Sequence, residues 1–176
     1  MADNLIDFKD GLKNISPSSL KKIYFHGFEK GIPALNTENY KYANGRWHIK
    51  GEFGGLYLGE NQKLCREEIR RVYAGKTPAK EYRLVELQIS LSKVLDLTDP
   101  GNLIKLNIEK EQLISGKGQV PKTVIIPNSI AKSAHESGYE AIIVPSATGL
   151  GKAIVLYEDN FKNNSYVKIL SNKKLF

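Results

Sequence analysis

The sequence has few of the residue types that cross-link a chain or hold a metal ion. Cysteine occurs once, at Cys65, and histidine occurs three times. A single cysteine excludes an internal disulfide and fits a reducing compartment. The histidines are scattered, and with Cys65 they give none of the spacings typical of zinc sites. We therefore expect no metal and no bound cofactor, and we interpret Cys65 as a packed core thiol rather than a nucleophile.

Long apolar runs are also missing. None approaches the roughly 20 residues that a membrane-spanning helix needs. Residues 1–10 carry three aspartates and lack the basic and apolar regions of a secretory signal. We expect a protein without membrane association that acts in the cytoplasm, either of the cell that makes it or of a target cell into which it is delivered.

Negative charge is in deficit, because 26 Lys and Arg stand against 19 Asp and Glu, which gives a net charge of +7. Such an excess attracts polyanions, including nucleic acids, acidic proteins and phosphorylated small molecules. The basic residues are spread along the chain and form no arginine-rich tract with interleaved aromatics, which is typical of a solvated, lysine-rich surface. A basic nucleic-acid-binding module stays open as an alternative function.

The length and apolar content suit one folded domain, since 41% of the 176 residues are apolar. We expect residues 1–22 to be a loosely held leader with a short helix that starts at residues 16–19, and residues 23–176 to be the domain. Strands dominate without regular alternation with helices, so the pattern predicts an α+β fold. Apolar periodicity predicts helices at 61–73 and 130–137 and strands at 23–26, 55–58, 82–91, 141–144, 153–157 and 166–170.

The connecting segments differ in what they predict. Residues 30–53 form a long polar loop, and long loops in compact domains are usually functional. Residues 99–101, Asp-Pro-Gly, are expected to form a turn. Residues 102–122 are ambiguous between one and two short helices.

Two motif matches fail on their spacing. Residues 149–152, Gly-Leu-Gly-Lys, are similar to the end of a phosphate-binding loop. That loop needs another glycine where Ser146 stands, and a helix where a strand is expected. Ser146 also lies outside a Gly-x-Ser-x-Gly elbow, so no serine hydrolase is predicted.

Four side chains remain that could do chemistry together. Arg46 lies in the long loop, Tyr57 on the strand after it, Glu68 on the next helix and Ser146 after the strand 141–144. Glu67 is the fallback carboxylate. Taken singly, each has an ordinary structural explanation, such as a solvated cation or a core aromatic ring.

Their order resembles the RES domain, a family named for its arginine, glutamate and serine. Gly45-Arg46-Trp47, residues 55–58 and Glu68 are similar to the front half of that domain. Residues 94–100 and 138–147 are similar to its back half. The resemblance spans about residues 23–170, nearly the whole chain, and although each block is weak alone, all of them occur in the family's order.

The resemblance implies a fold and an activity. The family's fold is like that of ADP-ribosyltransferases, with a split β-sheet core and a few helices around an NAD+ cleft. Its members are bacterial toxins that destroy NAD+ by hydrolysis or phosphorolysis, or that ADP-ribosylate a target. A helix-turn-helix antitoxin of the Xre type usually neutralises them. We therefore expect an NAD+ glycohydrolase or phosphorylase, with ADP-ribosyl transfer to a protein or nucleic acid as the alternative.

One position departs from the family pattern. The family usually has a Tyr-Arg pair on the first strand, where this chain has Phe25-His26-Gly27. His-Gly at this place resembles the diphtheria-toxin and poly-ADP-ribose polymerase branch, in which the histidine holds NAD+. The resemblance thus implies that His26 and Gly27 contact the substrate, with His26 donating a hydrogen bond to the ribose or the amide.

The chemistry of NAD+ gives each matched residue a role. Arginine forms paired hydrogen bonds with phosphate oxygens, so Arg46 would bind the pyrophosphate. Tyr57 would stack on the cationic nicotinamide ring. A carboxylate near the ribose stabilises the positive charge that develops there, which is the role expected of Glu68. Ser146 would hold a ribose hydroxyl, a phosphate or the amide in position.

Overall fold

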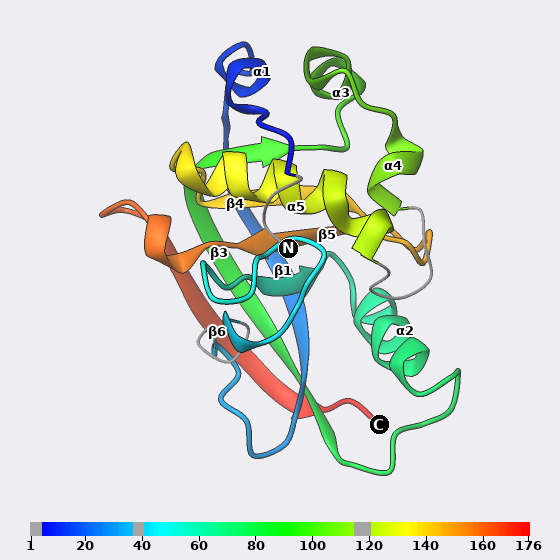
Figure 1. Ribbon diagram of the computed structural model, residues 1–176. Helices are drawn as coiled ribbons and strands as arrows, with labels where there is room; N and C mark the ends of the chain where they lie inside the picture. Colours follow the sequence, from blue (N-terminus) through cyan, green and yellow to red (C-terminus); the bar gives the residue numbers. More distant parts are fainter. Residues whose placement is uncertain (1–4, 37–40, 115–120) are drawn as a thin grey trace.

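The computed structural model describes residues 5–36, 41–114 and 121–176 (Figure 1). In these ranges, six strands form one mixed sheet in the order β1-β2-β5-β4-β3-β6, and β1 also pairs with β3. Five of the strands therefore close into a ring, and β6 lies at the edge. The strands are β1 (Ser18–Glu29), β2 (Leu56–Gly59), β3 (Tyr82–Asp96), β4 (Ala141–Pro145), β5 (Lys152–Leu156) and β6 (Tyr166–Lys174).

The helices are α1 (Lys9–Lys13), α2 (Gln62–Val72), α3 (Pro100–Leu106), α4 (Lys110–Ile114) and α5 (Pro121–Glu136), with a 3-10 turn η2 (Glu158–Asn160). They pack around the sheet, with α5 across β4 and β5 and α2 next to β2 (Figure 1). The α+β fold predicted from the sequence is confirmed. No helix in the described ranges has the length and apolar character needed to cross a membrane.

Strand β4 divides two main cores because its side chains alternate between the two faces of the sheet. Ile142 and Val144 pack with α5 and with the N-terminal segment, whereas Ala141 and Ile143 face the core formed by β1, β2 and β3. A strand covered on both faces is apolar throughout, as 141–144 is. A smaller core around Cys65 lies under α2.

The N-terminal segment is wrongly predicted. Residues 16–19 start no helix, because Ser18 pairs with Val94 and opens β1. The residues before them are not a loose leader, since Phe8, Leu12 and Ile15 are buried in the core. Strand β1 also runs across the expected boundary at residue 22.

Most predicted elements are confirmed, but several are longer than expected. Strand β3 continues to Asp96, β6 continues to Lys174, and α5 begins at Pro121 and contains Pro127. The two short helices allowed for 102–122 are α3 and α4. Residues 99–101 are not a free turn, because the Asp99 carboxylate accepts a hydrogen bond from the Gly101 amide at 2.7 Å and caps α3.

Candidate functional site

A cavity of about 440 Å³ opens between α2, the long loop and the end of β4. This volume is in the range of small-molecule sites. Six of the seven residues predicted from the sequence line it, namely His26, Gly27, Arg46, Tyr57, Glu68 and Ser146. The seventh, Glu67, is not in the lining and instead forms an ion pair with Arg70 at 2.9 Å. The structure thus distinguishes Glu68 from its neighbour, while the catalytic roles stay predictions.

Glu68 and Ser146 are in direct contact at the wall of the cavity. The Ser146 hydroxyl donates to Oε1 of Glu68 at 2.8 Å and accepts from the Thr148 amide at 3.1 Å. The segments that carry them are joined again at the start of α2. There Asn61 caps the helix through the Leu64 amide and donates to the Leu150 carbonyl at 3.0 Å. The carboxylate is therefore held by contacts from both segments.

Arg46 lies at the cavity on the loop that precedes β2. Its guanidinium donates to the Leu113 carbonyl at 3.1 Å. Partial burial lowers the pKa of Arg46 from its ordinary value, an effect that nearby Tyr57 opposes. An arginine remains charged under such shifts. The cavity therefore holds a fixed positive charge.

His26 is buried on β1 and lines the cavity. Its Nδ1 lies 2.9 Å from the Tyr57 carbonyl oxygen, which can only accept, so we assign the ring proton to Nδ1. Burial lowers the pKa of His26 to about 4. The ring is thus neutral at pH 7 and its Nε2 is an acceptor. In this tautomer Nε2 would accept a hydrogen bond from a ligand, whereas the sequence prediction has His26 donate one; the contact with the substrate stays a prediction.

Tyr57 lines the cavity, and its hydroxyl binds the preceding loop. The hydroxyl accepts from the Trp47 amide at 3.0 Å and lies 2.9 Å from Nδ1 of His48. Nε2 of His48 donates to the Ala43 carbonyl at 3.1 Å, and in the neutral tautomer with this proton Nδ1 accepts from the Tyr57 hydroxyl. The Tyr57 hydroxyl is therefore occupied, which leaves the ring as its surface for a ligand.

Two residues that bind the Arg46 loop have no counterpart in the sequence prediction. They are His48, which is 3% exposed, and Asn128 on α5. The Asn128 amide donates to the carbonyls of Gly45 and Arg46, each at 2.8 Å. Asparagine is unfavourable inside a helix, so its position just after Pro127 is the only local signal of a special role.

Cys65 belongs to the cavity wall but not to its chemistry. Its thiol donates to the Phe25 carbonyl at 3.2 Å, and burial raises its pKa to about 11. The prediction of a packed core thiol is confirmed. Within residues 5–36, 41–114 and 121–176, no cluster of histidine, cysteine and acidic residues is placed to hold a metal ion.

Comparisons with known proteins agree with this architecture. Among curated proteins no match was found. Among solved structures, a chain of the M. tuberculosis MbcT–MbcA toxin–antitoxin complex superposes with a TM-score of 0.79 at 19% sequence identity, over 95% of this chain and 91% of that one. At this identity the match shows a shared fold. The family model of the RES domain matches residues 22–172, and the chain therefore belongs to the RES domain family.

Proposed function

We propose that this protein is an NAD+-cleaving toxin that breaks the bond between nicotinamide and ribose. One observation carries the proposal: a single cavity brings together the charge of Arg46, the ring of Tyr57 and the hydrogen-bonded pair Glu68–Ser146. NAD+ offers a partner for each, namely a pyrophosphate, a planar cation and a ribose that becomes positive as the bond breaks.

In the proposed reaction, the bond between C1′ of the ribose and the ring nitrogen breaks, and its electron pair leaves with neutral nicotinamide. Glu68 stabilises the positive charge that develops on the ribose. A preorganised group of this kind is worth on the order of a hundred- to a thousandfold in rate. Ser146 fixes the carboxylate in place through the hydrogen bond at 2.8 Å.

His26 supports the proposal as an acceptor. Its unprotonated Nε2 suits a ribose hydroxyl or the carboxamide NH₂, both of which donate. Because burial lowers its pKa to about 4, it adds no positive charge next to the nicotinamide cation. A neutral acceptor here is compatible with a cationic substrate, whereas a protonated ring would repel it.

The acceptor is water or phosphate in the proposed reaction. Water gives ADP-ribose and releases a proton, and phosphate gives ADP-ribose 1″-phosphate. Transfer to a protein or nucleic acid is the alternative outcome for the same site. We further propose that the protein acts on the cytoplasmic NAD+ pool. By analogy with the solved toxin–antitoxin complex, we propose that an Xre-type helix-turn-helix antitoxin is its partner.

The test is the loss of NAD+ over time, with and without phosphate, for the wild type, Glu68→Gln and Glu67→Gln. Glu67 is the matched control, because it is adjacent on α2 but pairs with Arg70 outside the cavity lining. We expect activity in the wild type and in Glu67→Gln and its loss in Glu68→Gln. Equal activity of all three proteins would refute the assigned site.

A parallel incubation with labelled NAD+ and a cell lysate separates the acceptors. Label in free ADP-ribose indicates hydrolysis, label in its 1″-phosphate indicates phosphorolysis, and label on a macromolecule indicates transfer. If the wild type consumes no NAD+ and labels nothing in either assay, the proposed function is wrong.

A further inference from the structure

The turn that carries Arg46 is held from one side by helix α5. The side-chain amide of Asn128 donates to the carbonyls of Gly45 and Arg46 at 2.8 Å, and a longer contact of 3.4 Å reaches the carbonyl of His48. The two N–H groups of this side chain thus bind two successive backbone carbonyls of the turn, and the His48 carbonyl lies near the same nitrogen. Asn128 itself is not among the residues that line the cavity.

The same turn is also held by Tyr57 and His48. The His48 ring packs so closely on Gly45 that a Cβ at this position would lie 1.9 Å from Cε1 of the ring. The Tyr57 hydroxyl binds both the Trp47 amide and the His48 ring. Only glycine fits at position 45, so the turn has little freedom to move between its two supports.

Arg46 lies between these supports with its side chain at the cavity. A flexible arginine loses conformational entropy when it binds an anion, and holding its backbone in advance reduces that loss. One of the two short hydrogen bonds from Asn128 ends at the Arg46 carbonyl itself, and the other ends at the residue before it. They therefore act directly on the residue proposed to bind the pyrophosphate.

We propose that Asn128 is a positioning residue for NAD+ binding that acts through Arg46. This inference rests on the proposed function, because it assumes that Arg46 binds the substrate. Asn128 touches no substrate atom in this assignment. Its contribution is to the affinity for the pyrophosphate portion and not to the cleavage of the glycosidic bond.

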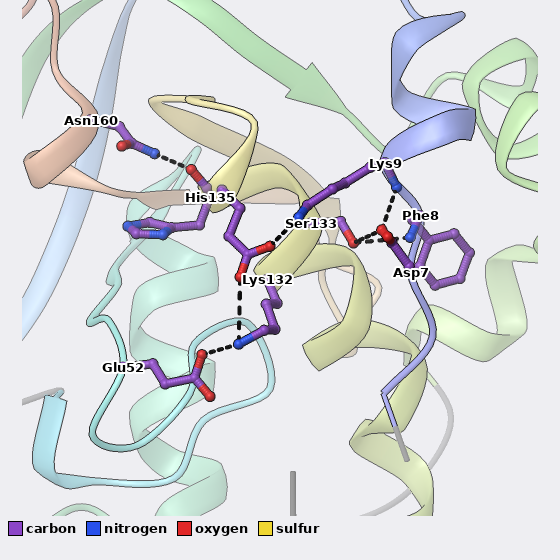
Figure 2. A network of polar contacts seen from close by, with 9 residues as sticks. Asp7, Phe8, Lys9, Glu52, Lys132, Ser133, His135 and Asn160 are labelled. Carbon is purple, nitrogen blue, oxygen red and sulfur yellow. Dashed lines mark hydrogen bonds and ion pairs between the residues drawn. The ribbon is translucent and has the colours of Figure 1, made fainter. Parts of the chain in front are cut away.

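Helix α5 offers a matched control one turn further along. Figure 2 shows Lys132 of α5 forming an ion pair with Glu52, which belongs to the same long loop. Lys132 also lies 3.5 Å from Glu136, which pairs with Lys9 at 2.6 Å. Lys132 therefore attaches the same loop to the same helix but makes no hydrogen bond or ion pair with the described residues of the turn at Arg46. Lys132→Met removes a loop attachment without touching that turn.

The experiment measures kcat and KM for NAD+ in the wild type, Asn128→Ala, Lys132→Met, Arg46→Ala and the double variant Arg46→Ala/Asn128→Ala. We expect Asn128→Ala to raise KM about tenfold, the scale of one lost hydrogen bond, with kcat changed less than threefold. Lys132→Met should keep the wild-type KM. In the double variant KM should equal that of Arg46→Ala alone, because residues that act through one contact are not additive.

Amide hydrogen exchange supplies a readout that needs no substrate. Peptides that cover residues 41–55 should exchange faster in Asn128→Ala, whereas peptides from α2 should not change. A helix that is merely destabilised would instead lower the unfolding temperature and reduce kcat through the loss of active protein, with KM unchanged.

An unchanged KM in Asn128→Ala, or a double variant whose KM is the product of the two single effects, overturns the inference while the proposed function stands. A wild-type protein that neither binds nor cleaves NAD+ overturns both. Should Asn128→Ala fail to fold, Asn128→Leu, which keeps a side chain of similar size but has no donor, takes its place with the same expected outcomes.

Discussion

Ser146 and Glu68 lie 78 positions apart in the sequence, yet the serine hydroxyl donates to the glutamate carboxylate at 2.8 Å. The contact joins the segment after β4 to the middle of α2. Because the carboxylate oxygen can only accept, the Ser146 proton is assigned to Glu68, while the Thr148 amide donates to the Ser146 oxygen and the Thr148 hydroxyl lies 2.8 Å from it. This relationship leads to the first prediction.

Ser146→Ala should lower kcat for NAD+ consumption without abolishing it. Misplacing a catalytic group by about 1 Å costs about a hundredfold in rate, and we expect a loss of at most this size. Glu68→Gln should lose more, and adding Ser146→Ala to it should cost little further. The measurement is single-turnover NAD+ loss. A Ser146→Ala effect that multiplies fully with that of Glu68→Gln would contradict a role through the carboxylate.

Tyr57→Phe should separate the two uses of this side chain. The ring that faces the cavity remains, but the hydroxyl that binds Trp47 and His48 is lost. Leaving a buried donor or acceptor unpaired, here the Trp47 amide and the His48 ring nitrogen, costs about 1–3 kcal/mol, so urea denaturation should show a loss of this size. Tyr57→Leu removes the ring as well and should further raise KM for NAD+. Equal KM values in the two variants would argue against stacking on the nicotinamide.

His26 should make stability depend on pH on the acidic side of neutrality. In the unfolded chain histidine is protonated below about pH 6.5, whereas burial lowers the pKa of His26 in the folded protein to about 4. The unfolded state therefore binds more protons between these values, and the free energy of unfolding falls as the pH falls through this window. The loss is on the order of 3 kcal/mol.

The measurement for His26 is urea denaturation at several pH values from 7 to 4. His26→Asn is the control, because its amide can still donate to the Tyr57 carbonyl but does not titrate. The difference in slope between the two proteins isolates His26. Parallel curves would show that this ring is not the origin of the acid sensitivity.

Glu140→Gln should destabilise the fold without acting on the cavity directly. Burial alone would raise the pKa of this fully buried carboxylate, but hydrogen bonds from Ser165, Lys162, Lys93 and Ser92 outweigh it and lower the pKa. In the glutamine variant, the NH₂ group would replace one carboxylate oxygen and could not accept from the donors that face it. We expect this to cost about 3 kcal/mol. Thermal denaturation is the measurement.

Glu86→Gln is the control for Glu140→Gln, because Glu86 lies on the exposed side of β3 and has one hydrogen bond, from Ser171, at 3.3 Å. It should unfold close to the wild type. An equal loss in both variants would show that a general charge effect, and not the buried network, explains the result.

The elements with strong local patterns could be predicted from the sequence. The alternation from Tyr82 to Leu91 predicts the first part of β3, and the spacing of Leu64 and Ile69 predicts α2. The last part of β3 escapes prediction because Ser92 and Lys93 break the alternation. Their backbone amides instead bind the Glu140 carboxylate, each at 2.7 Å, and such a long-range partner leaves no local signal.

The N-terminal segment shows the same limit. Phe8 and Leu12 are buried, but α1 has only five residues, too few for a helical period to stand out among charged neighbours. Aspartate is common both in turns and at the N-terminal caps of helices, so Asp99 alone does not distinguish the two. Only the residues that follow it decide between them.

The candidate site divides in a similar way. The family pattern identifies the side chains that face the cavity, since their order along the chain is distinctive. The supports of Arg46 were not predicted, because Asn128 and His48 act through backbone carbonyls whose positions depend on the folded loop. The tautomer of His26 likewise depends on the Tyr57 carbonyl, which belongs to another strand.

The position of β5 in the sheet has a consequence for how the protein is made. Strand β2, which carries Tyr57, pairs with β1 at a single position but with β5 at four. Strand β5 is synthesised late and inserts between β2 and β4, which precedes Ser146. A nascent chain therefore cannot assemble the cavity until β5 has left the ribosome. Under the proposed function, we therefore expect the growing polypeptide to have no NAD+-cleaving activity for most of its translation.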